Sequence, residues 1–124
     1  MDAQTYDIPK DGYAGGYSHR IVGWNGVDAD GNPAGGQVSG MGISIAWQAG
    51  PVAAYGVNGA DVTDVLEGCK QRLDFYQDSN FACDENEQAI YHLRSALNAL
   101  RERTERRLMQ GVEGKNIAHT SDNP

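Results

Sequence analysis

The sequence predicts an α+β fold, with a small antiparallel N-terminal sheet packed with a C-terminal two-helix hairpin. Two observations lead to this prediction. Thirteen of the 16 glycines lie between Gly12 and Gly59, in a part of the chain whose apolar residues alternate with a period of two, as in strands. Residues 60–110 contain one glycine and no proline, and their apolar residues recur every three or four positions, as in amphipathic helices.

Length and charge predict one compact, acidic domain. The 124 residues amount to 13.4 kDa, which suits a single core. We expect one domain over 1–124, with a flexible lead-in at 1–17, a sheet at 18–57, a hairpin at 58–114 and a mobile tail at 115–124. A net charge of -7 argues against general affinity for long nucleic acids and for anionic membranes.

Two or three short strands are expected in the first half. Gly12 to Tyr17 is typical of flexible backbone, and Ser18 to Trp24 predicts the first strand. Asn25 to Gly36 is rich in glycine, asparagine and proline, so it should reverse the chain. Gln37 to Gln48 predicts the next strand region, in which Gly40 interrupts the alternation and indicates a bulge.

The first helix is predicted from about Val62 to about Gln77. Asn58 or Asp61 can cap its first amide groups, and Ser79 with the residue after it breaks the pattern. Its apolar stripe consists of Val62, Val65, Leu66, Cys69, Leu73 and Tyr76.

The second helix begins near three acidic residues, Asp84, Glu85 and Glu87, whose charge complements the positive end of the helix dipole. Its apolar stripe consists of Ile90, Leu93, Leu97, Leu100, Thr104 and Leu108. Gly111 offers a left-handed cap at the end. The two helices are thus predicted to form a hairpin.

No catalytic, metal or cofactor site is expected. Cys69 and Cys83 form neither a C-x-x-C pair nor a Cys/His cluster, so we expect no disulfide and no zinc. Asp28 to Asn32 resembles the start of a calcium-binding loop, but Ser39 occupies the position where that loop needs its glutamate. We therefore interpret the segment as a turn. The three histidines are scattered and no serine lies in a nucleophile elbow.

The chain is expected to stay in the cytoplasm where it is made. No stretch approaches the 18 or so apolar residues of a membrane span. The first five residues lack the basic and apolar regions of a signal peptide.

Arginines form the strongest candidate binding feature. Residues 94–107 carry a net charge of +3, whereas the remainder of the chain carries -10. The five arginines are Arg94, Arg101, Arg103, Arg106 and Arg107. Arg103 and Arg107 are one helical turn apart, roughly 6 Å along the axis, and two such guanidinium groups can bind neighbouring phosphates. Alternatively, the arginines pair with nearby carboxylates or stabilise the negative end of the helix.

Two aromatic residues flank the loop between the predicted helices. Tyr76 and Phe81 could stack a nucleobase, and Asn86 is close enough in sequence to read or orient it. Packing of either ring in the core is the alternative interpretation.

The sequence resembles a family of phage proteins that inhibit bacterial defence. Arg103-Thr104-Glu105-Arg106-Arg107 followed by Gly111-Val112-Glu113-Gly114 resembles the ending shared by the Thoeris anti-defence 1 (Tad1) family and the anti-CBASS protein Acb2. Residues 37–45, Trp47-Gln48, Gly50-Pro51 and Asn58-Gly59-Ala60 resemble the Tad1 branch. The resemblance covers roughly residues 18–114.

The resemblance implies a protein that is not an enzyme but a sponge, which binds cyclic ADP-ribose isomers (gcADPR) made by Thoeris TIR enzymes and leaves them intact. It would act in the host bacterial cytoplasm during phage infection. Relatives also bind CBASS cyclic di- and trinucleotides, and they form homodimers that combine into hexamers with ligand between protomers. A phosphodiesterase-like hydrolase and a phage structural or protein-interaction module are the alternatives.

The resemblance also implies roles for individual residues. Arg103 and Arg107 would hold phosphates, Thr104 would support them, Asn86 would orient the ligand, and Tyr76 or Phe81 would stack a base. The chain departs from the common ending at Gln110, where relatives often carry a basic residue.

Overall fold

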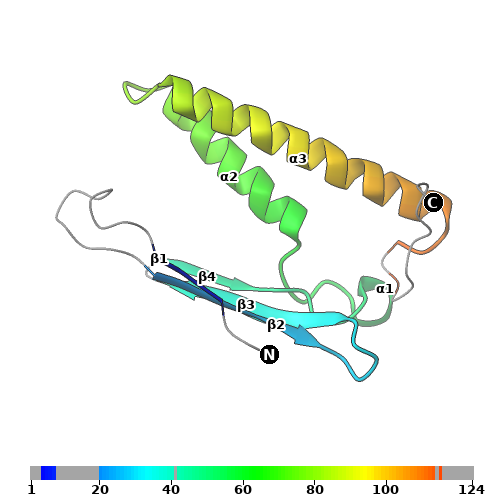
Figure 1. The fold of residues 1–124 in the computed structure, drawn as a ribbon. Helices are drawn as coiled ribbons and strands as arrows, with labels where there is room; N and C mark the ends of the chain where they lie inside the picture. Colours follow the sequence, from blue (N-terminus) through cyan, green and yellow to red (C-terminus); the bar gives the residue numbers. More distant parts are fainter. Residues whose placement is uncertain (1–3, 8–19, 41, 114, 116–124) are drawn as a thin grey trace. The chain divides into compact units, whose positions relative to one another are not determined.

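The computed structural model describes residues 4–7, 20–40, 42–113 and 115, which belong to two compact units (Figure 1). The described residues up to Ala60, which include the sheet, and Lys115 belong to the first unit, and residues 61–113, which include the helical hairpin, belong to the second. The boundary lies where the glycine content of the chain falls. The α+β fold class is confirmed, whereas packing of the sheet with the hairpin stays a prediction.

The sheet has four antiparallel strands in the order β1-β2-β3-β4. Their bounds are Gln4–Asp7 for β1, Arg20–Val27 for β2, Pro33–Gly40 for β3 and Ile43–Ala46 for β4. The expectation of two or three strands was therefore wrong. β1 lies inside the expected flexible lead-in, which consequently contains a strand. Residues 1–3 and 8–17 of the lead-in, and residues 116–124 of the expected tail, lie outside the described residues.

The expected bulge at Gly40 was also wrong, because the chain reverses there and β4 follows. Gly42 has a φ of 84°, a left-handed value that suits glycine in a tight reversal. The register shift of this sheet lies instead between Asn25 and Val27. β3 begins earlier than expected, because the glycine-rich segment before Gln37 pairs with β2 instead of forming the reversal. At Gly36 a Cβ would lie 2.5 Å from the carbonyl oxygen of Trp24, so only glycine permits this close pairing.

The turn predicted at Asp28 to Asn32 is confirmed. One carboxylate oxygen of Asp28 accepts hydrogen bonds from the backbone amides of Asp30, at 2.9 Å, and Asn32, at 3.0 Å. Side-chain carboxylates commonly close turns in this way. The reversal between β2 and β3 is thus confined to five residues, rather than the twelve expected from the glycine content.

Two amide side chains close the loop after β4, which contains the short helix α1 (Val52–Tyr55). Gln48 Oε1 accepts from the backbone amides of Asn58, at 2.9 Å, and Gly59, at 3.2 Å. Asn58 in turn exchanges two hydrogen bonds of 2.8 Å with the backbone of Ala49. Asn58 therefore holds this loop and does not cap the following helix.

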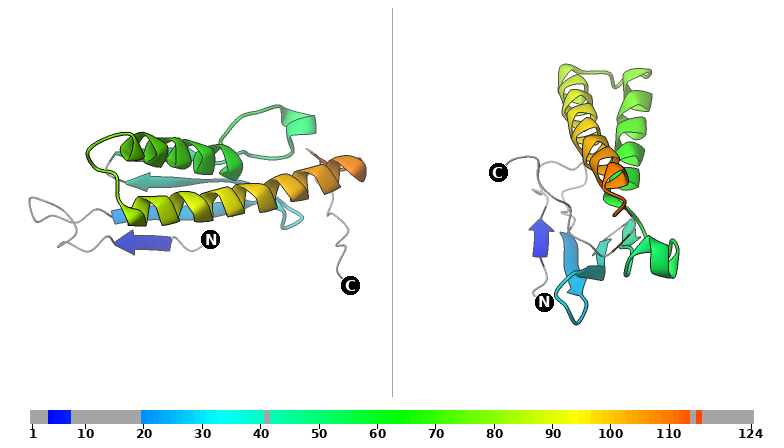
Figure 2. Two further views of the ribbon diagram at one scale, coloured as in Figure 1. Left: turned by 90° about the horizontal axis from the view of Figure 1, so that it is seen from above. Right: turned by 90° about the vertical axis from the view of Figure 1, so that its right-hand side faces the viewer.

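The hairpin consists of α2 (Val62–Gln77) and α3 (Asp84–Met109), which lie side by side in Figures 1 and 2. Asp61 caps α2, since its carboxylate accepts from the amide of Thr63 at 3.1 Å. Ile90 and Leu97, 3% and 7% exposed, form the buried core of the described residues, and both lie on α3. The apolar periodicity thus correctly predicted both helices.

α3 extends well past the helix beside it. With 26 residues it is about 39 Å long, whereas the 16 residues of α2 span about 24 Å. Because the helices are joined at the tip of the hairpin, roughly the last ten residues of α3, 100–109, have no α2 beside them. We call this segment the overhang. No helix among the described residues is both long and apolar enough to span a membrane.

Leu97→Ala should lower the free energy of unfolding by about 2–4 kcal/mol, because it removes a buried side chain and leaves a cavity in the hairpin core. Urea unfolding followed by far-ultraviolet circular dichroism measures this change. Leu108→Ala is the matched control, since Leu108 is 62% exposed on the same helix. Equal effects of the two substitutions would contradict the assignment of the core.

Candidate ligand-binding site

The six candidate residues fall into two groups near opposite ends of α3. Tyr76, Phe81 and Asn86 lie at the hairpin tip, and Arg103, Thr104 and Arg107 lie on the overhang. From Asn86 to Arg103 the helix rises about 25 Å. One protomer therefore brings together the members of each group but does not bring the two groups together.

A backbone turn ends α3 directly after the overhang. The amide of Gly111 donates to Leu108 O at 3.1 Å, and the amide of Val112 donates to Arg107 O at 3.0 Å. These two bonds, together with the φ of 71° at Gly111, form a Schellman motif. The left-handed cap predicted at Gly111 is thereby confirmed.

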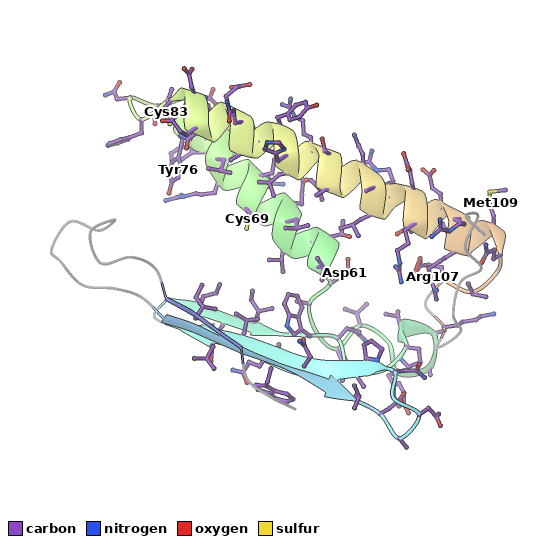
Figure 3. The ribbon with its side chains drawn as sticks, viewed as in Figure 1. Asp61, Cys69, Tyr76, Cys83, Arg107 and Met109 are labelled. Atoms are coloured by element: carbon purple, nitrogen blue, oxygen red, sulfur yellow. The ribbon has the colours of Figure 1, made fainter. Side chains whose placement is uncertain are left out.

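Arg107 is held against this turn. It is 6% exposed, and its Nη2 donates to Val112 O at 2.8 Å. Its Nε lies 3.7 Å from a carboxylate oxygen of Glu113. Figure 3 shows Arg107 at the C-terminal end of α3. Direct contacts thus join the two halves of the motif that resembles the family, the arginine pattern at 103–107 and G-V-E-G at 111–114. Gly114 itself lies outside the described residues.

The other two candidates on the overhang differ in exposure. Arg103 is exposed, so its guanidinium is accessible to a ligand. Thr104 is half-buried, and its hydroxyl donates to Leu100 O at 3.1 Å within the helix. This bond engages the hydroxyl proton, but the oxygen keeps acceptor capacity.

A hollow that is open to solvent lies on the overhang. Its lining residues are Glu102, Glu105, Arg106, Met109 and Gln110. Gln110, the residue that departs from the common ending, is therefore part of a surface depression beside Arg106.

The tip of the hairpin brings Phe81 and Asn86 into contact. Asn86 Nδ2 donates to Phe81 O at 3.2 Å, and the amide of Phe81 donates to Ser79 Oγ at 3.1 Å. These bonds hold the backbone of Phe81 while its side chain stays exposed, at 78%. Tyr76, in contrast, is half-buried at the end of α2.

Arg72 is a residue of this tip that the sequence analysis missed. Its Nε donates to the hydroxyl of Tyr76 at 3.3 Å. Its guanidinium carbon lies 5.2 Å from the ring centroid of Tyr76 and 5.4 Å from that of Phe75. The spacing of four residues between Arg72 and Tyr76 on one helix was the available signal.

The described residues contain no cluster of three or more His, Cys, Asp or Glu side chains that could hold a metal ion. Cys69 and Cys83 are exposed free thiols. The candidate side chains offer guanidinium groups, aromatic rings and an amide for contacts with a ligand.

Comparison with known proteins identifies relatives of the hairpin. Residues 41–105 match the family model described as Acb2/Tad1, hairpin domain. The chain is 41% identical over 71 residues to a protein of Bacillus phage SBSphiJ7 called Thoeris anti-defense 1. That match covers 57% of this chain and 50% of the phage protein, so the chain spans about half the length of the curated relative it matches.

The family match covers Tyr76, Phe81, Asn86, Arg103 and Thr104, and it ends before Arg107 and the C-terminal turn. It confirms the resemblance noted in the sequence. Since the matched residues make up more than half of the sequence, the chain belongs to the Acb2/Tad1 hairpin-domain family.

Proposed function

We propose that this chain is a phage anti-defence protein that binds and sequesters the cyclic ADP-ribose isomers (gcADPR) of Thoeris TIR enzymes without degrading them. Its membership of the Acb2/Tad1 family, together with the relative called Thoeris anti-defense 1, is the observation that carries the proposal. CBASS cyclic di- and trinucleotides are additional candidate ligands. The chain would act in the cytoplasm of the infected host.

The charge distribution supports a compact anionic ligand. The net charge of +3 on residues 94–107 attracts phosphates at short range, whereas the -10 on the rest of the chain repels extended polyanions. Arg103 is exposed on the overhang and can donate paired hydrogen bonds to a phosphate. A small cyclic nucleotide therefore fits better than DNA or RNA.

The distance between the two groups of candidate residues supports a site shared by two protomers. A ring built from two riboses, a base and a pyrophosphate is far smaller than the roughly 25 Å between Asn86 and Arg103. If two α3 helices pair antiparallel across a two-fold axis, the tip of one protomer meets the overhang of the other. The site would then be completed in a homodimer, and hexamers would contain three such pairs.

Sequestration also sets an affinity requirement. The protein must hold the signal more tightly than the receptor does, and a nanomolar dissociation constant corresponds to about -12 kcal/mol. A stacked base and several charge-assisted hydrogen bonds together can supply free energy of this size.

A protein-interaction module is the second candidate function, and the contacts of Arg107 favour it. A guanidinium that is 6% exposed and bonded to Val112 O has a structural role within its own protomer. In such a module the arginines would stabilise the C-terminal turn and subunit contacts, and gcADPR would not bind.

Intact gcADPR should be recovered after it is bound and the protein is then denatured by heat. Chromatography of the supernatant measures the ligand, with a heated sample lacking protein as the control. A sponge releases the unchanged molecule because no bond is broken. A cleaved product would contradict sequestration and favour the hydrolase.

Arg103→Ala should weaken gcADPR binding about 10-fold to 100-fold, since a hydrogen bond to a charged group contributes about 1.5–3 kcal/mol. Isothermal titration calorimetry measures the change. Lys70→Ala is the control, because it removes one positive charge from α2, outside the arginine-rich segment 94–107. Equal affinities of the two variants would remove the proposed phosphate role of Arg103.

Arg107→Ala should weaken binding and also lower the free energy of unfolding by about 1–3 kcal/mol, because it leaves Val112 O without its guanidinium donor. Thermal unfolding without ligand detects the structural effect, and Arg101→Ala, at an exposed position, is the control. Unchanged stability of Arg107→Ala would show that its contacts with the turn contribute little to the fold.

A further inference from the structure

We propose that Arg72 is a positioning residue of the ligand site, which fixes the ring of Tyr76 so that it stacks against the base of the bound nucleotide. This inference rests on the proposed function, because it requires a ligand that contains a base. It also chooses between the two aromatic candidates at the tip.

The geometry around Arg72 restricts the Tyr76 ring in two ways. The 3.3 Å hydrogen bond from Arg72 Nε fixes the hydroxyl end of the ring. The guanidinium carbon, 5.2 Å from the ring centroid, is within the range of a cation–π interaction. The same guanidinium carbon also lies 5.4 Å from the ring centroid of Phe75, and the centroids of the Phe75 and Tyr76 rings are 6.4 Å apart.

The choice of partners distinguishes Arg72 from an ordinary surface cation. Lys70, the other cation of α2, forms a salt bridge of 2.9 Å with Asp74, four residues further along. Among the described residues, Arg72 has no carboxylate partner within salt-bridge distance, although α2 carries several acidic side chains. It contacts the two aromatic rings instead.

This arrangement has a consequence for binding. A ring that is already held in place loses less conformational entropy when a base stacks on it, so the ligand binds more tightly. The terminal nitrogens of Arg72 donate no hydrogen bond to the rest of the described chain, so their N–H groups can face an anionic ligand. Phe81 is 78% exposed and has no cation against its ring among the described residues.

The test compares gcADPR binding by calorimetry in five variants: Arg72→Ala, Arg72→Lys, Tyr76→Phe, the double variant that combines Arg72→Ala with Tyr76→Phe, and the control Lys70→Ala. Arg72→Ala should bind about tenfold more weakly, whereas Lys70→Ala, which loses the same charge from the same helix, should stay within twofold. Arg72→Lys should recover little affinity, because lysine keeps the charge but lacks the planar group and its Nε–H. Tyr76→Phe should weaken binding when Arg72 is present. In the Arg72→Ala background the same substitution should cause no further loss, because the hydrogen bond between the two side chains is already absent.

A second readout separates positioning from general attraction. Stacking lowers the ultraviolet absorbance of adenine, so this decrease on binding should be smaller in Arg72→Ala at saturating ligand than in wild type and Lys70→Ala. Full recovery of affinity in Arg72→Lys, or an unchanged absorbance decrease in Arg72→Ala, would overturn the positioning role.

Failure of this inference can be told apart from failure of the proposed function. If wild type binds gcADPR and Arg72→Ala binds equally well, Arg72 is not a positioning residue and the sponge proposal stands. If wild type itself fails to bind, the proposed function is wrong and this inference falls with it. Circular dichroism of each variant confirms that the helices are intact.

Discussion

The difference in length between α2 and α3 separates the two groups of candidate residues along α3. Packing of the two helices buries Ile90 and Leu97, which lie in the part of α3 that α2 accompanies, and leaves the overhang with no helix beside it in its own hairpin. The same length separates the tip from the overhang by about 25 Å. A hairpin with helices of equal length would lack the overhang and its arginines.

The C-terminal turn shows how one motif serves structure within the protomer. Gly111 lets the chain turn back, and the turned segment supplies Val112 O and the Glu113 carboxylate to Arg107. Burial of a guanidinium requires such partners, because an uncompensated charge in a nonpolar environment is strongly unfavourable. Arg103, one turn earlier, stays exposed. Two arginines that look equivalent in the sequence therefore have different surroundings.

The helices could be predicted closely because periodicity and capping are local properties: Asp61, the acidic first turn of α3 and Gly111 mark their ends directly. The strands were harder, because glycines such as Gly36 and Gly42 serve both in close strand contacts and in reversals. In the candidate ligand-binding site, the residue types indicated which side chains could contact a ligand, but not which neighbouring groups those side chains contact in the fold. The burial of Arg107 depends on a turn that forms after the helix, and the contacts of Arg72 depend on side-chain conformations that spacing does not specify.

Complementation between two defective protomers tests most directly whether tip and overhang of different copies form one site. Tyr76→Ala and Arg103→Ala chains, each expected to bind gcADPR more weakly than wild type on its own, would be co-expressed with different tags and purified as mixed pairs. The shared site predicts that each mixed pair regains one intact site. The wild-type tip of the Arg103→Ala chain meets the wild-type overhang of the Tyr76→Ala chain there, whereas the other site of the pair contains both substitutions. Calorimetry that shows no regained binding in the mixed pairs would contradict the account.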